Sequence, residues 1–286
     1  MQTPQGAPVV VGVNGSAAGL AAVRLAAREA VARDRELRVV HAFSWPSPTS
    51  DNQDYAPARR AAAEIVAQAV TTAQRSTPGV RVTGAVHDGP ATRVLLHQSR
   101  SAELMILGDD DLATIPRLPA DSVLVQTVAR AWCPVAVARG LRPPRGGLIA
   151  AVDGSPTSLE ALRHAAAEAA RRELVLEVVH VVAERGGEAE RAGRQVLAAA
   201  MAEVPEATRV RTRLLTGDPA GTLLRVSRHA RLVVMGPRGL DSGALLGQVA
   251  HEVLRRCACP TVFVHGTTAG VRRSPGTVRS AGALAT

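Results

Sequence analysis

The same pattern occurs twice in this sequence, and the repeat constrains the fold more than any other feature. An apolar run that ends in Asn-Gly-Ser at residues 14–16 returns in mid-chain, where it ends in Asp-Gly-Ser at residues 153–155. Later anchors recur in the same order, among them a Cys-Pro step at residues 133–134 and again at 259–260. A unit that recurs in this way is one structural module, so we expect two copies of one domain.

The chain of 286 residues is long enough for two domains of common size. Paired prolines and glycines interrupt the periodic segments between the copies, and this composition predicts a linker. The end of the chain places arginines among Ser, Pro, Gly and Thr without an acidic residue, which predicts a disordered basic tail. The expected divisions are a first domain at 1–140, a linker at 141–147, a second domain at 148–266 and the tail at 267–286.

Composition excludes several classes of protein. No stretch of about eighteen uncharged apolar residues is present, so we expect no transmembrane helix and no membrane partner. The first residues lack the charge and apolar run of a signal peptide, and the three cysteines do not form a disulfide framework. These features predict a cytoplasmic protein.

The formal net charge of +9 comes from arginine alone, because the sequence contains no lysine. Arginine favours phosphate, which could indicate a nucleic-acid partner. Most of the arginines lie beside acidic residues in helical segments, however, and two Phe, one Tyr and two Trp offer few surfaces for stacking bases. We therefore expect no nucleic-acid partner.

Short apolar runs alternate with longer segments of helical period, a pattern typical of a parallel sheet covered by helices. In the second copy, Ser155 followed by Pro156 predicts the start of a helix. Strands are expected at 148–152, 174–182, 209–215, 232–235 and 261–265, and further helices at 188–202, 220–229 and 247–255. Ligands of such sheets bind beyond the carboxyl ends of the strands, where the strand order reverses. That rule selects the turn at 153–155 and the segment that begins at Gly236.

At these residues the chain resembles a tandem universal stress protein. The resemblance rests on Val-Asp-Gly-Ser after the first strand, Gly-Asp-Pro-Ala before the third helix, the glycine segment after the fourth strand, and Cys-Pro before the fifth. It implies an α/β fold of two Rossmann-like domains in a pseudo-twofold arrangement. Each would hold an open five-stranded parallel sheet of order 3-2-1-4-5 flanked by helices. Many members carry an ATP site with an aspartate near the adenine. Their phosphate loop reads Gly, two residues, Gly, nine residues, Gly, then Ser or Thr.

The first copy keeps the spacing of that loop but changes its chemistry. Gly108 is followed by an aspartate run that puts Asp111 at the second glycine and Asp121 at the third, and Asn14 replaces the adenine-side aspartate. Carboxylates that face a triphosphate oppose it electrostatically. A solvated acidic loop, rather than a metal site, is the expected role of residues 109–111. We therefore expect the first domain not to bind nucleotide.

The second copy keeps the glycines but shortens the loop to seven residues between Gly239 and Gly247, which Gln248 follows. The resemblance implies a site for ATP, with or without Mg²⁺, in this domain alone. Its expected residues are Asp153, Gly154, Ser155, Gly236, Arg238, Gly239, Gly247 and Gln248. Asp153 could instead do no more than form a turn and start a helix.

The sequence shows no catalytic constellation and no metal-ligand pattern, so we do not expect an enzyme. His41 and His180 are expected to be polar strand-end residues, and Cys257 and Cys259 to be structural. Two functions remain open: a nucleotide-responsive stress protein, or a nucleotide-independent scaffold of the same fold that binds other proteins. The domains are expected to pack through the strands at 134–138 and 261–265, because pairing protects exposed sheet edges. Whether the chain also forms a homodimer stays open.

Overall fold

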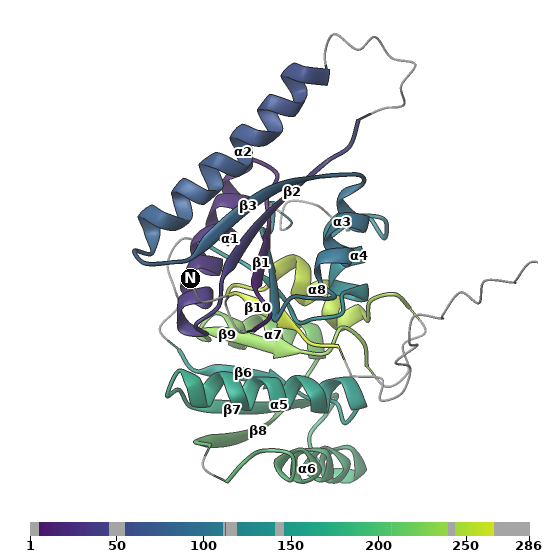
Figure 1. Ribbon diagram of the computed structural model, residues 1–286. Coiled ribbons are helices and arrows are strands. Elements are labelled where there is room, and N and C mark those ends of the chain that lie inside the picture. Colours follow the sequence, from purple (N-terminus) through teal and green to yellow (C-terminus); the bar gives the residue numbers. More distant parts are fainter. Residues whose placement is uncertain are drawn as a thin grey trace, which may run out of the picture.

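A single ten-stranded sheet runs through the computed structural model (Figure 1), with the strand order β3-β2-β1-β4-β5-β10-β9-β6-β7-β8. The structure describes residues 6–45, 55–110, 112, 119–140, 146–206, 208–239 and 244–265. The strands are β1 (Val9–Gly12), β2 (Leu37–Phe43), β3 (Val82–Asp88), β4 (Leu104–Leu107), β5 (Val135–Val137), β6 (Leu148–Ala151), β7 (Leu176–Val182), β8 (Val210–Thr216), β9 (Leu232–Met235) and β10 (Thr261–Phe263).

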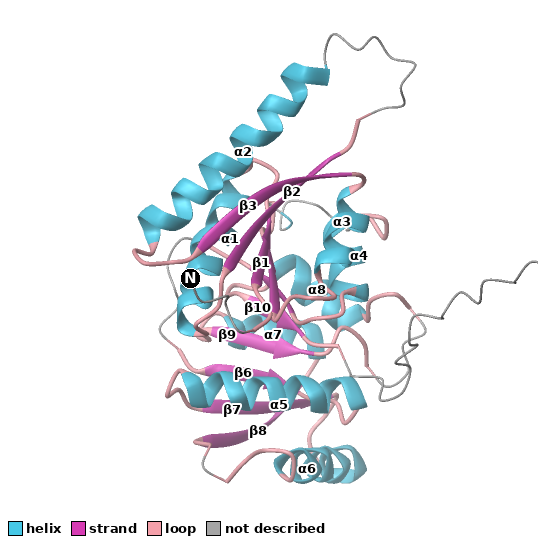
Figure 2. Ribbon diagram, in the orientation of Figure 1, coloured by secondary structure: helices cyan, strands magenta, loops and turns pink. Residues whose placement is uncertain are grey.

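Helices alternate with the strands along the chain and cover both faces of the sheet (Figure 2). They are α1 (Ala17–Ala32), α2 (Tyr55–Ser76), α3 (Ala91–Gln98), α4 (Val123–Arg130), α5 (Pro156–Arg171), α6 (Gly187–Met201), α7 (Pro219–Ser227) and α8 (Gln248–Arg256). One buried core joins α1, α2, α5 and α6 to the sheet, and a second joins α3, α4, α7 and α8 to its other face. The predicted α/β class is therefore confirmed.

The helix that follows the first strand of each domain begins with the same device. Ser16 Oγ accepts a hydrogen bond from Gly19 N at 2.9 Å, and Ser155 Oγ accepts one from Ser158 N at 3.2 Å. Pro156 lies in the first turn of α5, as predicted, where its missing N–H costs no hydrogen bond. Gly154 precedes this cap with a φ of +83°, a conformation that favours glycine.

The two domains join through β5 and β10, as the edge argument predicts. These strands pair in antiparallel fashion, with Val262 opposite Ala136, so the sheet continues from one domain into the other. Two side chains cross the junction reciprocally: Arg139 donates to the carbonyl oxygen of Leu254 on α8, and His265 Nε2 donates to that of Val128 on α4 at 2.7 Å. The junction is therefore pseudo-twofold.

A cluster of charged residues on α1 and α5 also spans the junction. Arg33, the C-cap of α1, binds Glu168 at 2.6 Å, and Arg172, the C-cap of α5, binds Glu29 at 2.7 Å. Each helix end thus supplies one acid and one base to the other. Glu168 is 1% exposed. Burial alone would raise the pKa of Glu168, but Arg33 and the neighbouring cations hold it down to about 2. The carboxylate is therefore charged inside the junction.

Some sequence-based expectations fall outside the described residues. They are most of the linker, at 141–145, the basic tail at 267–286, and Asp111. Of the linker, Gly146 and Gly147 are described. A Cβ at Gly146 would lie 1.7 Å from the carbonyl oxygen of His229, so that position requires glycine.

Candidate functional site

A cavity of about 650 Å³ lies in the second domain at the carboxyl ends of β6 and β9. Its volume is in the range of small-molecule sites. Ala151, Val152, Val179, Val181 and Met235 give it an apolar lining. Most of the predicted site residues line it as well: Asp153, Gly236, Arg238, Gly239, Gly247 and Gln248. The other two, Gly154 and Ser155, form the turn that follows β6. The structure thus brings the predicted residues together.

Asp153 is oriented by the turn it belongs to. Its Oδ1 accepts hydrogen bonds from Ser155 N at 3.0 Å and from Ser155 Oγ at 2.5 Å. Its Oδ2 makes no hydrogen bond with any described residue and lies close to Gly239. One carboxylate oxygen therefore serves the turn, and the other has no hydrogen-bond partner among the described residues.

Two glycines of the loop after β9 lie against side chains that leave little room for a Cβ. A Cβ at Gly239 would lie 2.7 Å from Asp153 Oδ2, and a Cβ at Gly236 would lie 2.9 Å from Thr157 Oγ1. Thr157 also donates from Oγ1 to the carbonyl oxygen of Arg238 at 2.8 Å, which fixes the loop against the start of α5. Sequence reasoning missed Thr157, because this contact depends on the packing of β9 beside β6.

Gly247 differs, since a Cβ there would meet nothing closer than 3.5 Å. It precedes α8 and offers no side-chain cap to that helix. The N–H groups of the first turn of a helix lack intrahelical partners, and they attract anions. Gln248, Val249 and Ala250 belong to this first turn and line the cavity. The cavity therefore presents uncapped donors at one end.

Arg238 links the cavity to the other domain. Its guanidinium donates to the carbonyl oxygen of Ala129 on α4, over a long distance of 3.4 Å. His180 also lines the cavity, and its Nδ1 donates to the carbonyl oxygen of Val152 at 2.8 Å. His41 makes the matching bond to Val13 at 2.8 Å, which favours the expected strand-end role for both histidines. The position of His180 in the cavity wall was not predicted.

The equivalent position in the first domain is filled from within. Asp110, in the loop after β4, accepts hydrogen bonds from Ser16 Oγ at 2.7 Å and from Asn14 Nδ2 at 3.1 Å. The cavity there measures about 190 Å³. Asp110 holds a φ of +40°, which its short polar side chain tolerates better than most. Asp110 thus covers the turn that follows β1.

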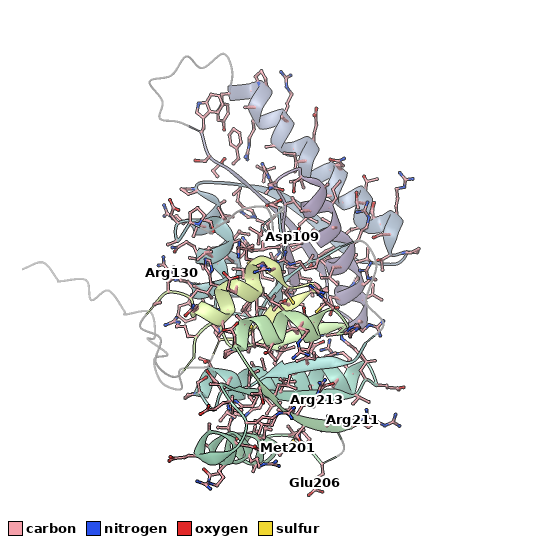
Figure 3. All side chains as sticks on the ribbon, turned by 180° about the vertical axis from the view of Figure 1, so that it is seen from behind. Asp109, Arg130, Met201, Glu206, Arg211 and Arg213 are labelled. Carbon is pink, nitrogen blue, oxygen red and sulfur yellow. The ribbon has the colours of Figure 1, made fainter. Side chains whose placement is uncertain are left out.

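The neighbouring aspartates of the first domain have other surroundings. Asp109 lies near the middle of the molecule (Figure 3) and pairs with Arg139 at 3.1 Å. Asp121 is exposed, and Ser122 beside it caps α4 by accepting from Val125 N at 3.2 Å. The Ser122 side chain thus accepts a hydrogen bond from a backbone N–H in the first turn of α4. The first turn of α8 has no such side-chain acceptor, because its N-cap is Gly247. Sequence reasoning selected Asp111 and Asp121, whereas Asp110 is the described residue that occupies the site.

The remaining candidate groups are buried or dispersed. Cys133, Cys257 and Cys259 are free and buried, with the last two sulfur atoms 3.8 Å apart. In the described part of the chain, no three His, Cys, Asp or Glu side chains are placed to hold a metal ion. None of the described helices is both long and apolar enough to cross a membrane.

Comparison with known proteins places both halves of the chain in one family. The model of the universal stress protein family matches residues 7–139 and 148–265. A universal stress protein of Mycolicibacterium smegmatis is 30% identical over 282 residues, which covers 90% of this chain and 96% of that protein.

A solved structure shares the fold of the whole chain. A universal stress protein from Archaeoglobus fulgidus DSM 4304 has a TM-score of 0.72 at 16% identity and covers 91% of this chain and 99% of its own. A shorter universal stress protein, solved in complex with cAMP, covers 47% of this chain and 98% of its own, with 21% identity and a TM-score of 0.38. The match to the family model over both halves and the relative at 30% identity show that the chain belongs to the universal stress protein family, whose unit it contains twice.

Proposed function

We propose that the protein is a nucleotide-responsive stress protein that binds one adenine nucleotide per chain, in the cavity of the second domain. The observation that carries the proposal is the contrast between the two equivalent positions. The second domain has a cavity of about 650 Å³, whereas Asp110 fills the turn of the first domain beside a cavity of about 190 Å³.

The residues of the cavity suit the two ends of a nucleotide. The free Oδ2 of Asp153 can accept hydrogen bonds from the nucleoside, and the apolar lining can cover its base. At the other end, the uncapped first turn of α8 can receive phosphate, and Arg238 and Gln248 can add side-chain donors. ATP, with or without Mg²⁺, is the expected ligand.

Gly247→Asp tests the proposal directly. The backbone at Gly247 has φ −65° and ψ 152°, the extended conformation of a helix cap, and a Cβ has room there. Aspartate is a favourable N-cap, so the variant is expected to fold at least as stably as the unmodified protein. Its carboxylate would repel phosphate and use the donors of α8. Isothermal titration calorimetry with ATP should give one site per chain for the unmodified protein and no binding for Gly247→Asp.

Asp110→Ala in the first domain is the matched control and should leave ATP affinity unchanged. A stoichiometry of two, or ATP binding that Gly247→Asp does not weaken, would contradict the proposal. The alternative function, a nucleotide-independent scaffold, predicts that millimolar ATP with magnesium leaves the thermal midpoint of the unmodified protein unchanged, since a ligand raises that midpoint only if it binds the native state.

A further inference from the structure

Trp132, in the turn between α4 and β5, is a second feature that distinguishes the two domains. Its side chain is 69% exposed. Its backbone N donates to Ser99 Oγ at 3.1 Å, and in the second domain the backbone N of Ala258 donates to Ser227 Oγ at 3.2 Å. The two turns are equivalent, and alanine is sufficient in one of them. The fold therefore does not require the indole of Trp132.

An open groove of about 1050 Å³ lies beside this tryptophan on the first domain, and we call it the Trp132 groove. It is lined by the end of β3, by α3 and by the end of α4. Trp132 is the one Trp, Tyr or Phe among its lining residues, and its three arginines are exposed: Arg93, Arg100 and Arg130. Figure 3 shows Arg130 at the outer edge of the molecule.

The charge of the Trp132 groove is not neutralised from within the described chain. The guanidinium of Arg100 lies 5.5 Å from the centroid of the Trp132 ring, and Arg130 donates to the neutral amide of Gln126 at 3.0 Å. The one acidic residue of the lining, Asp88, pairs with Arg59 at 3.1 Å. The groove thus combines an exposed indole with excess positive charge.

We propose that the Trp132 groove docks an acidic peptide segment of a partner protein, with an apolar side chain against the indole and carboxylates on Arg93, Arg100 and Arg130. Tryptophan and arginine are the residues that contribute most often at protein interfaces, and arginine binds carboxylates in a bidentate manner. Single-stranded nucleic acid is disfavoured because it usually stacks on several large aromatic side chains, and this groove offers one Trp and no Tyr or Phe. The proposal is independent of nucleotide binding, since no residue of the Trp132 groove lines the cavity of the second domain.

Fluorescence polarisation of a short labelled peptide rich in Asp and Glu, with leucine anchors, tests the proposal on the full chain. The unmodified protein should bind this peptide and should not bind the same peptide with every acid replaced by its amide. Trp132→Ala installs the residue that the second domain uses and should weaken binding about thirtyfold. Arg100→Ala should weaken it about tenfold.

Arg228→Ala is the matched control, because Arg228 follows Ser227 as Arg100 follows Ser99. It should leave affinity unchanged, and equal thermal midpoints would show that the variants fold. Three outcomes would overturn the proposal: no binding of the acidic peptide, tighter binding of oligothymidylate than of the peptide, or unchanged affinity in Trp132→Ala. Sedimentation that shows self-association lost in Trp132→Ala would instead identify the occupant as a second copy of this chain and would also overturn it.

Discussion

Asn14 and Asp153 form equivalent turns in the two domains, but the side-chain atom that the turn does not use is an amide nitrogen in Asn14 and a carboxylate oxygen in Asp153. Asn14 Oδ1 accepts from Ser16 N at 3.1 Å, and Asp153 Oδ1 accepts from Ser155 N at 3.0 Å. The other polar atom of the Asn14 side chain, Nδ2, donates to Asp110. The other oxygen of the Asp153 side chain, Oδ2, has no hydrogen-bond partner among the described residues. An aspartate at position 14 would repel Asp110, so the two residues of the first domain are matched to each other.

Asp153→Ala distinguishes the ligand role of this residue from its role in the turn. Loss of a hydrogen bond to a charged group should weaken ATP binding by about 1.5–3 kcal/mol, or roughly ten- to over a hundredfold. Loss of the turn alone should lower the free energy of unfolding by about 1 kcal/mol and leave ATP affinity nearly unchanged. Thermal unfolding with and without ATP, combined with calorimetry, measures both effects.

Asn14→Ala provides the comparison, because it removes the same turn bond where we expect no nucleotide. It should lower stability by a similar amount and should not affect ATP affinity. If Asp153→Ala reduced stability as Asn14→Ala does and left ATP binding intact, Asp153 would have the structural role alone.

At the scale of the helix, α1 and α5 act as a pair across the domain junction. Glu29 on α1 and its C-cap Arg33 face Glu168 on α5 and its C-cap Arg172. Arg171 also contacts Glu168. Removal of one partner of a buried ion pair leaves the opposite charge buried without compensation. The free energy lost in this way is larger than the net stabilisation that the pair contributes. The cluster therefore opposes any rearrangement that separates the two helices.

Glu168→Gln should lower the free energy of unfolding by about 3 kcal/mol near neutral pH. The folded-state pKa of Glu168 is lowered from 4.5 to about 2, so the unfolded chain takes up the proton first as pH falls. The stabilisation is therefore complete above about pH 4.5 and lost toward about pH 2. Denaturant unfolding across this pH range should show that the free energies of unfolding of Glu168→Gln and the unmodified protein become more alike as the pH falls.

Glu190→Gln serves as the control, since Glu190 pairs with Arg194 on the exposed face of α6. Exposed pairs contribute little, so this variant should be nearly as stable as the unmodified protein. The free energies of unfolding of Glu168→Gln and the unmodified protein could instead differ by a constant amount from neutral pH to pH 2. That result would show that charge on Glu168 does not stabilise the junction.

The elements themselves were largely predictable, because periodicity and caps act over a few residues. The strand expected at 232–235 is observed as β9, and Ser155 caps α5. Contacts between distant segments were not predictable in the same way. The bonds from Asp110 to Asn14 and from Arg238 to Ala129 depend on which strands lie side by side and on how the domains meet. The family motif predicted most of the residues of the second-domain site. It did not predict that Asp110 would fill the equivalent position in the first domain.

The molecule as a whole depends on the pairing of β5 with β10, because each strand would otherwise be the edge of its domain. Val135–Val137 and Thr261–Phe263 are buried, and all of these residues except Thr261 are apolar. An exposed edge of this kind binds other strands. We therefore expect the junction to prevent β5 and β10 from pairing with strands of other molecules.

The second domain produced alone, as residues 148–265, should self-associate through β10 in an antiparallel arrangement like that of the junction. Size-exclusion chromatography with light scattering should report a dimer or larger species. Adding the separate first domain, residues 6–140, should replace these species with a one-to-one complex. A monomeric second domain with the thermal midpoint of the full chain would show that β10 needs no partner.

The covalent union of the two units has a genetic consequence. When two identical chains pair, every substitution is inherited by both sites at once, and a change that spoils one spoils the other. Here the antiparallel junction joins two separately encoded units, so each can accumulate substitutions independently. Asp110 stands in one unit where Arg238 stands in the other, and Trp132 stands where Ala258 does. A single chain can thus hold two units of one fold with different side chains at equivalent positions.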